Sequence, residues 1–248
     1  MNYNRHSRIF INDPFSEGNI HLSELQSHYL TNVMRKKISD QVVIFNGIDG
    51  EYLAEINAIR KKQVVLKATK KLKAQVKERE LVLIFALIKN HRLNYLIEKA
   101  TEMGVTEFVP IVTQHSVRDK FNIAKAKSWV IEACEQSERL SVPSISDPVK
   151  LDDLIKSWDP QAEIIFANES ESGCSFSDLG KKLHQDSKYA ILIGPEGGFS
   201  DDEKKTLSNL EFIRSVHLGP RILRSESAAI CAISCMQLLL NNLSSRNL

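Results

Sequence analysis

An uninterrupted apolar run at residues 81–88 (LVLIFALI) constrains the fold more than any other feature of the sequence. A strand of this kind is typical of a parallel sheet that is covered on both faces. A helix with one apolar side is predicted over 92–103, and Gly104 marks its end. Similar strands and amphipathic helices alternate along the rest of the chain, which predicts an α/β domain with a parallel sheet. The other expected strands are 107–112, 163–168, 189–194 and 215–218, and the other expected helices are 123–140 and 227–243.

The front of the chain has a different pattern. Short segments rich in β-branched and aromatic residues predict strands at 8–12, 41–46, 51–56 and 63–69, with turn residues between two of them. One helix is expected over 23–37, and its apolar stripe consists of Leu22, Leu25, Tyr29, Val33 and Met34. These elements predict a small β-barrel with a helix, and the charged stretch 70–80 is the expected linker.

Charge also separates the two parts. Residues 1–75 hold 12 Lys/Arg and 7 Asp/Glu, whereas residues 76–248 hold 21 and 24, so the total of +2 hides a basic front. A basic segment favours a polyanionic partner, and a well-solvated surface is the alternative. No apolar stretch reaches the ~20 residues that span a bilayer, and the N-terminus lacks the apolar core of a signal peptide. The four cysteines show no metal-ligand spacing. We therefore expect a soluble cytoplasmic protein without a metal.

The segment 193–200 (IGPEGGFS) leaves a buried strand and enters a helix. Open α/β sheets bind ligands in such loops, at the carboxyl ends of the strands. The loop is neither a P-loop nor a GxGxxG motif. Asp201, Asp202 and Glu203 already occupy the positive end of the following helix, which disfavours a phosphate and favours a neutral or cationic ligand. A tight turn that needs glycine only for its backbone angles is the alternative.

A second loop, 218–229 (LGPRILRSESAA), again links a strand to a helix, with Ser225 or Ser227 as the expected N-cap. Two arginines and a glutamate lie in this turn, and a capped helix with surface charges is the simplest explanation. Because the two loops follow consecutive strands, a shared ligand site is at least as well supported.

Several segments together resemble the SPOUT class of knotted methyltransferases, and within it the ribosomal RNA small-subunit methyltransferase E (RsmE) family. They are IGPEGGFSDDE (193–203), LGPRILRSESAA (218–229), EKATEMGVTEFVPIVTQHS (98–116), EACEQSERLSVP (132–143), HYLTNVMRKKISD (28–40) and RIF (8–10). The departures are Ser225 and Ser227 in place of threonine, Met34 and Met103 in place of leucine, and Ser39 in place of glycine. Because the hydroxyl groups at 225 and 227 are kept, the departures leave the cofactor loops intact.

The resemblance implies a PUA-like RNA-binding β-barrel at 1–72 and a SPOUT α/β domain with a deep trefoil knot at 73–248. It implies a homodimer that transfers a methyl group from S-adenosyl-L-methionine to N3 of a uridine in 16S rRNA of the small (30S) ribosomal subunit. Backbone groups of the two loops and of the strand end at 167–169 would hold the adenine. Glu169 or Glu196 would face the positive sulfonium or the amino group. The expected cofactor-binding residues are Asn168, Glu169, Ile193, Gly194, Pro195, Glu196, Gly197, Gly198, Leu218, Gly219, Ile222, Leu223 and Ser227.

Uridine N3 carries an imide proton and is a nucleophile only once that proton has left. The enzyme must generate the anion with a base or stabilise it with cationic donors. We expect Arg224 to stabilise the charge and Glu226 to act as base or positioning group, although Glu226 at a helix start also suits a purely structural role. RNA contacts are expected from Arg5, Arg8, Arg35, Lys36, Lys37, Arg118, Gln136 and Arg139. The alternative for the arginines is a surface ion pair.

Two alternatives for the function stay open at this point. One is a SPOUT enzyme that acts on tRNA or on ribose 2′-hydroxyls, and the other is a ribosome-assembly factor that binds RNA without catalysis. The last helix is apolar on more than one side, which predicts either a dimer interface or enclosure in the protein's own core.

Overall fold

The computed structural model describes residues 6–15, 18–61, 63–116, 121–168, 173–184 and 187–245. The chain forms two compact units. The first consists of Met1–Lys77 together with Cys134–Val142, and the second of Glu78–Ala133 together with Pro143–Leu248. The domain bounds expected from the sequence, 1–72 and 73–248, stay a prediction.

The second unit is built around a parallel sheet with the strand order β12-β10-β11-β6-β7-β8, and β9 also pairs with β7. The predicted α/β class and parallel sheet are therefore confirmed. The short edge strands β8 and β9 were not predicted, because two residues carry no periodicity. The strands are β6 (Leu81–Ala86), β7 (Glu107–Val112), β8 (Ser144–Ile145), β9 (Val149–Lys150), β10 (Glu163–Ala167), β11 (Tyr189–Ile193) and β12 (Ile213–Val216).

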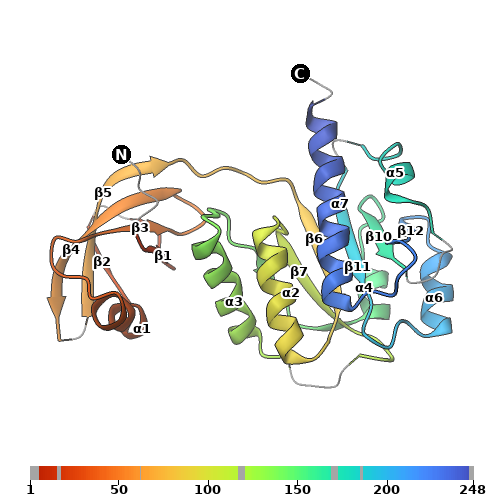
Figure 1. Ribbon diagram of the computed structural model, residues 1–248, viewed down its shortest axis with the longest axis horizontal. Helices are drawn as coiled ribbons and strands as arrows, with labels where there is room; N and C mark the ends of the chain where they lie inside the picture. Colours follow the sequence, from red (N-terminus) through yellow and green to blue (C-terminus); the bar gives the residue numbers. More distant parts are fainter. Residues whose placement is uncertain are drawn as a thin grey trace. The chain divides into compact units, whose positions relative to one another are not determined.

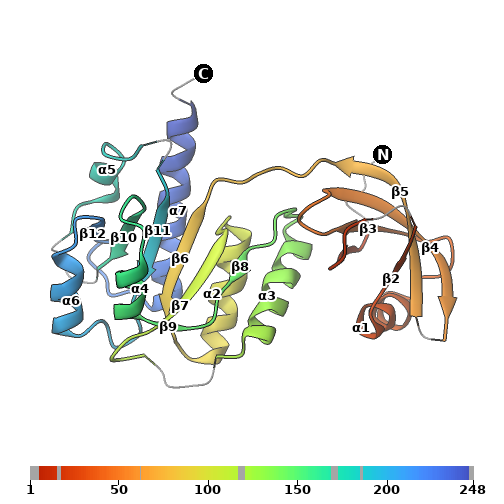
Figure 2. The same cartoon turned by 180° about the vertical axis from the view of Figure 1, so that it is seen from behind.

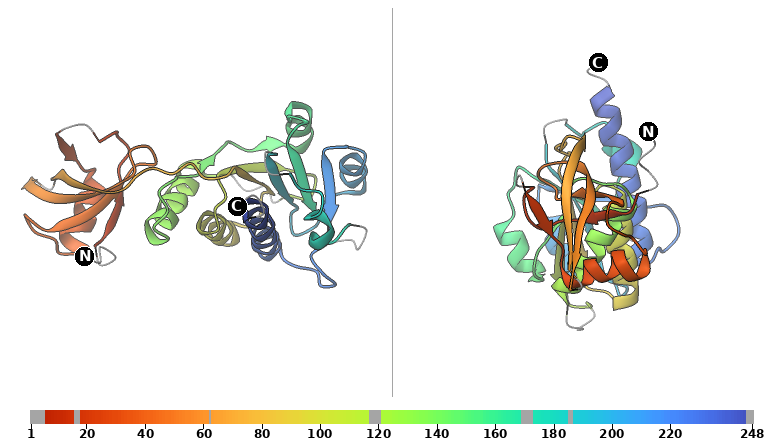
Figure 3. Two further views of the ribbon diagram at one scale, coloured as in Figure 1. Left: turned by 90° about the horizontal axis from the view of Figure 1, so that it is seen from above. Right: turned by 90° about the vertical axis from the view of Figure 1, so that its left-hand side faces the viewer.

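Helices cover both faces of this sheet. On one face lie α2 (Asn90–Glu102) and α7 (Ser225–Ser245), which pack against each other (Figure 1; Figure 3, left). On the other face lie α4 (Leu151–Ser157) and α6 (Asp201–Ser208), seen from behind in Figure 2. Successive strand residues serve opposite layers, as the continuous apolar run requires, so that Leu83 and Phe85 alternate with Ile84 and Ala86 and all four are buried. The remaining helices are α3 (Ile123–Gln136) and α5 (Phe176–Leu179).

The first unit contains a mixed sheet with the order β1-β3-β4-β5-β2, in which β1 and β3 are parallel and the other pairs antiparallel. Its core is formed by aliphatic residues from all five of these strands, including Ile44, Ile56 and Leu66, together with Leu30 from a π-helical turn. The elements are β1 (Arg8–Phe10), β2 (Asn19–His21), α1 (Glu24–His28), the π-helical turn η2 (Tyr29–Val33), β3 (Gln41–Phe45), β4 (Glu51–Arg60) and β5 (Gln63–Lys73).

The helical segment of the first unit differs from the prediction. A short α-helix followed by a π-helical turn replaces the helix expected over 23–37. The apolar stripe does not pack as one face, because Leu25, Tyr29, Val33 and Met34 are exposed while Leu22 and Leu30 are buried. The π-helical turn rotates the chain away from the 3.6-residue period on which the prediction depended.

The segment 134–142 belongs to the first unit and is held there by Arg8. The Arg8 guanidinium donates from Nη1 to the Cys134 carbonyl oxygen at 2.7 Å and from Nε to Glu51 Oε2 at 3.0 Å. The Phe10 amide donates to Glu135 Oε1 at 2.9 Å. The helix expected over 123–140 ends at Gln136, and Glu138 follows in the left-handed region with φ 57°. Among the described residues, no helix is both long and apolar enough to cross a membrane.

Candidate functional site: a cavity at the ends of three parallel strands

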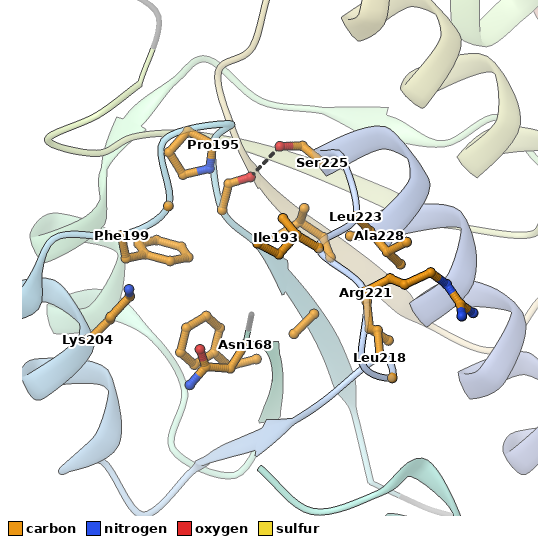
Figure 4. Close-up of a pocket in the computed structure, with 16 residues that line it drawn as sticks. Asn168, Ile193, Pro195, Phe199, Lys204, Leu218, Arg221, Leu223, Ser225 and Ala228 are labelled. Carbon is orange, nitrogen blue, oxygen red and sulfur yellow. Dashed lines mark hydrogen bonds between the residues drawn. The ribbon is translucent and has the colours of Figure 1, made fainter. Parts of the chain in front are cut away.

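A cavity opens where β10, β11 and β12 end. Because these three strands are parallel neighbours, the segments after them emerge at one edge of the sheet. The cavity encloses about 590 Å³ of empty space, part of which is open to solvent. It is lined by Phe166, Ala167, Asn168, Ile193, Gly194, Pro195, Gly198, Phe199, Lys204, Leu218, Gly219, Arg221, Ile222, Leu223, Ser225 and Ala228 (Figure 4).

The two glycine-containing loops are joined directly. Ser225 begins α7 and is buried, and its Oγ donates to the carbonyl oxygen of Gly194 at 2.8 Å (Figure 4). Gly194 has no space for a side chain, because a Cβ there would lie 2.7 Å from Cε2 of Phe199. Phe199 is itself buried edge-on against Phe166, with 5.2 Å between the ring centroids. The loop after β11 is therefore held on both sides.

The start of α6 is satisfied within the protein. Glu203 Oε2 accepts the Ser200 amide at 2.8 Å, and Ser200 Oγ accepts the Glu203 amide at 3.3 Å, which completes the predicted capping box. Glu203 Oε1 also accepts the Gln114 amide at 2.9 Å. With the Ser200 and Glu203 amides occupied and three carboxylates in its first turn, this helix end disfavours a phosphate.

Arg92, which the sequence did not indicate, connects the two loops electrostatically. It lies in the first turn of α2, just after the carboxyl end of β6, the neighbour of β11 in the sheet. Its Nη1 lies 2.7 Å from Glu196 Oε1 and its Nε 3.8 Å from Glu226 Oε1. Arg92 follows a buried strand directly. Because ligands bind beyond the carboxyl ends of such strands, this position could have marked Arg92 as a candidate site residue, as it did for the two loops.

The two predicted catalytic residues have contrasting environments. Arg224 is exposed, in the turn between the cavity-lining residues Leu223 and Ser225. The Glu226 side chain is only 12% exposed, and its Oε2 is buried and accepts no hydrogen bond within the described part of the chain. The site therefore combines an exposed cation with a sheltered carboxylate that keeps one oxygen available.

The predicted cofactor-binding residues mostly converge. Those lining the cavity are Asn168, Ile193, Gly194, Pro195, Gly198, Leu218, Gly219, Ile222 and Leu223. Glu196 instead pairs with Arg92, Gly197 faces the His115 side chain, and Ser227 is exposed on α7. Glu169 lies outside the described residues. Five further lining residues, Ala167, Phe199, Arg221, Ser225 and Ala228, lie within the predicted strand end and loops but were not named individually as cofactor-binding residues, and Phe166 and Lys204 lie outside them.

The predicted RNA contacts are more dispersed. Arg35, Lys37 and Gln136 are exposed, and Lys36 is half-buried. Arg139 is buried, the Arg8 side chain is only 7% exposed, and the contacts of Arg8 favour a structural role in the first unit. Arg5 and Arg118 lie outside the residues that the structure describes. The RNA-binding role of all eight remains a prediction.

Comparison with known proteins first defines the class. A family model described as "RNA methyltransferase domain" matches residues 75–237, and one described as "RNA methyltransferase PUA domain" matches residues 22–69. The chain is therefore a two-part RNA methyltransferase of the PUA-containing type.

Individual relatives define the family. The ribosomal RNA small subunit methyltransferase E of Rickettsia conorii is 37% identical over 95% of this chain and 96% of its own length. A Legionella pneumophila methyltransferase, solved in complex with S-adenosylmethionine, is 29% identical with a TM-score of 0.83, over 94% of this chain and 98% of that one. The fold also matches a Neisseria gonorrhoeae ribosomal RNA small subunit methyltransferase E at TM-score 0.83, with 23% identity over 95% of this chain and 98% of that one. The chain belongs to the RsmE family.

Proposed function

We propose that this protein transfers a methyl group from S-adenosylmethionine to N3 of a uridine in 16S rRNA. The observation that carries the proposal is the cavity formed by two joined loops, with Arg224 and Glu226 next to its lining. Its support is membership of a family whose curated relatives are named small subunit rRNA methyltransferases, together with the cofactor bound in the Legionella structure.

The cavity fits the cofactor chemically. Its walls consist largely of glycine, proline and aliphatic residues, which present backbone amides and carbonyls to an adenine without a charged side chain. The carboxylates of Glu196 and Glu226 are paired with Arg92, and the capping box at the start of α6 agrees with a ligand that has no phosphate. The cofactor, when bound, supplies an electrophilic methyl group.

The protein's own residues must prepare the uridine. Glu226 presents a buried carboxylate oxygen that receives no hydrogen bond from any residue the structure describes, which suits acceptance of the N3 proton. Arg224 is exposed in the same turn, where an RNA base can approach, and its guanidinium stabilises the negative charge that develops on the uracil ring. The pair therefore divides the chemistry into proton acceptance and charge stabilisation.

Mass mapping of 16S rRNA from a deletion strain tests the substrate. We expect N3-methyluridine to disappear from one position and to return when the gene is supplied. If the modification is retained, this assignment is wrong and a tRNA or ribose substrate takes its place. Calorimetry with S-adenosylmethionine tests whether the protein is an enzyme. An RNA-binding assembly factor without catalysis would show no binding at millimolar concentrations of this ligand.

The serines of α7 provide a matched pair for the cofactor loops. Ser225→Ala removes the hydrogen bond to the Gly194 carbonyl, which leaves a partly buried acceptor and costs about 1–2 kcal/mol. We expect affinity for S-adenosylmethionine to fall roughly tenfold by calorimetry. Ser227→Ala, two residues further along the helix and exposed, is the control, with affinity close to that of the wild type. If both substitutions lower the affinity equally, the Ser225–Gly194 hydrogen bond is not what supports cofactor binding.

The remaining predictions concern assembly. We propose a cytoplasmic homodimer in which α7 contributes to the interface. Ile233, Met236 and Leu240 are enclosed in the protein's own core, while Leu238 on the same helix is 64% exposed. The trefoil knot and the domain bounds 1–72 and 73–248 are proposed from the family resemblance. Sedimentation of the wild-type protein and of Leu238→Arg tests the interface, and an unchanged dimer would overturn it.

A further inference from the structure

The segment that follows β7 contacts the loop after β11, although it does not border the cavity. In the sheet, β6 lies between β7 and β11, so the carboxyl ends of these three parallel strands emerge at the same edge. Residues 113–116 come directly after β7, and none of them lines the cavity. Any influence of this segment on a bound cofactor must therefore pass through the loop after β11.

Residues 113–116 form a turn that is fixed by its own hydrogen bonds. Ser116 Oγ accepts the Thr113 amide at 2.9 Å and lies 2.8 Å from Thr113 Oγ1. The Ser116 amide donates to the carbonyl oxygen of Thr113 at 3.3 Å, and Thr113 is buried. Between them, the Gln114 amide donates to Glu203 Oε1, which ties the turn to the start of α6. The backbone that carries His115 is therefore held in place on both sides of this residue.

His115 reaches from this turn to the loop after β11. Its Nδ1 lies 3.1 Å from the carbonyl oxygen of Gly198. Because a carbonyl oxygen can only accept, Nδ1 must carry the proton and donate it. Gly198 is buried whereas His115 is exposed, so the imidazole covers the loop on its solvent side.

The glycine pair of the loop permits this approach. A Cβ at Gly197 would lie only 3.3 Å from Cβ of His115, so a side chain there would press against the histidine. Gly198 has φ 68°, which glycine adopts without strain, and its amide donates to the carbonyl oxygen of Pro195 at 3.0 Å. Residues 195–198 therefore form a tight turn, and His115 packs against its second half.

The turn 195–198 shapes one wall of the cavity. The residues in or next to this turn that line the cavity are Gly194, Pro195, Gly198 and Phe199 (Figure 4). Glu196, also in the turn, is paired with Arg92. Two side chains from other strand ends, Arg92 after β6 and His115 after β7, therefore hold the same four-residue turn.

We propose that His115 is a positioning residue for S-adenosylmethionine, because its hydrogen bond to the Gly198 carbonyl holds the turn 195–198 in the shape that completes the cavity. The inference rests on the proposed function, since it takes this cavity as the cofactor site. Because His115 does not line the cavity, its loss weakens cofactor binding without slowing the bound complex. A side chain that only packed against the loop would need no hydrogen-bond donor.

His115→Leu removes the donor and keeps much of the side-chain volume. We expect S-adenosylmethionine to bind about fivefold more weakly by calorimetry, the effect of one net hydrogen bond. At saturating S-adenosylmethionine, kcat with 16S rRNA should stay within about twofold of the wild type, because only binding is affected. His184→Leu replaces an exposed histidine of the second unit that does not line the cavity, and this control should bind like the wild type.

His115→Asn separates the hydrogen bond from packing. The Nδ2 of asparagine is separated from Cβ by the same number of bonds as Nδ1 of histidine, and it can donate to the same carbonyl. We expect this variant to recover most of the affinity that His115→Leu loses. Wild-type affinity in His115→Leu, no recovery in His115→Asn, or a fall in kcat as large as the fall in affinity would overturn the proposal.

Amide hydrogen exchange of the protein without cofactor tests the same bond independently of the cavity's ligand. We expect the Gly198 amide, which donates to Pro195, to exchange about fivefold faster in His115→Leu and at nearly the wild-type rate in His115→Asn. An unchanged rate in His115→Leu would overturn the proposal. If the wild type binds no S-adenosylmethionine, the proposed function fails, while the exchange rates still decide whether His115 holds the turn.

Discussion

Replacing Arg224 by alanine is expected to abolish methyl transfer while S-adenosylmethionine still binds with nearly its original affinity. Arg224 is exposed and does not line the cavity, so its loss leaves the cofactor walls intact. Its guanidinium acts on charge that develops on uracil only during the reaction. Removing one such electrostatic group typically lowers kcat by about 10²–10³. Single-turnover transfer of a labelled methyl group and calorimetry measure the two effects separately.

Arg221 provides the control for this experiment. It lies three residues earlier in the same loop, is also exposed, and lines the cavity. We expect Arg221→Ala to leave the single-turnover rate within about threefold of the wild type, consistent with the modest effect of most surface substitutions. Nearly intact turnover in Arg224→Ala, or equal losses in both variants, would show that another group stabilises the uracil anion.

The strands and the two loops could be predicted because their signals are local. Residues 81–88 form a continuous apolar run, and the segments 193–200 and 218–229 combine glycines with helix-start residues over a few positions. Arg92 could not be assigned in the same way. Its partners Glu196 and Glu226 lie more than 100 positions away in the sequence, and only the strand order β11-β6 brings them together.

The errors in the first unit have the same origin. The stripe of Leu25, Tyr29, Val33 and Met34 has helical spacing, but a π-helical turn and the limited size of the barrel core leave these residues exposed. Arg8 has the composition of an RNA contact, yet its guanidinium is held by Glu51 and by the Cys134 carbonyl. A basic residue in a sequence indicates a charge, but only the fold shows which carboxylate or carbonyl balances it.

Arg92→Met is expected to damage both cofactor binding and turnover. Arg92 is the cation shared by two carboxylates, Glu196 in the loop after β11 and Glu226 at the start of α7, whose side chains are 27% and 12% exposed. Without it, two partly buried carboxylates lack their shared cation. Losing this charge-assisted contact costs about 1.5–3 kcal/mol, which corresponds to roughly 10- to 100-fold in kcat/KM. Steady-state kinetics with varied S-adenosylmethionine and calorimetry measure the two components.

Lys99 offers a matched control on the same helix. Its ammonium also lies between two carboxylates, 2.9 Å from Glu98 and 2.7 Å from Glu102, and these hydrogen bonds raise its pKa. Because Lys99 is half-buried rather than enclosed and does not line the cavity, Lys99→Met should change stability by less than about 1 kcal/mol and leave kinetics unaltered.

A second substitution separates charge from simple packing at Arg92. If unbalanced negative charge is the cause of the defect, Arg92→Met/Glu196→Gln should recover much of the lost affinity for S-adenosylmethionine, because it removes one of the two carboxylates that Arg92 had balanced. The kcat defect should persist, since Glu226 still lacks its cation. If the guanidinium acts only through its packing volume, the double variant will bind S-adenosylmethionine no better than Arg92→Met. That result would show that Arg92 does not act through its charge on the two loops.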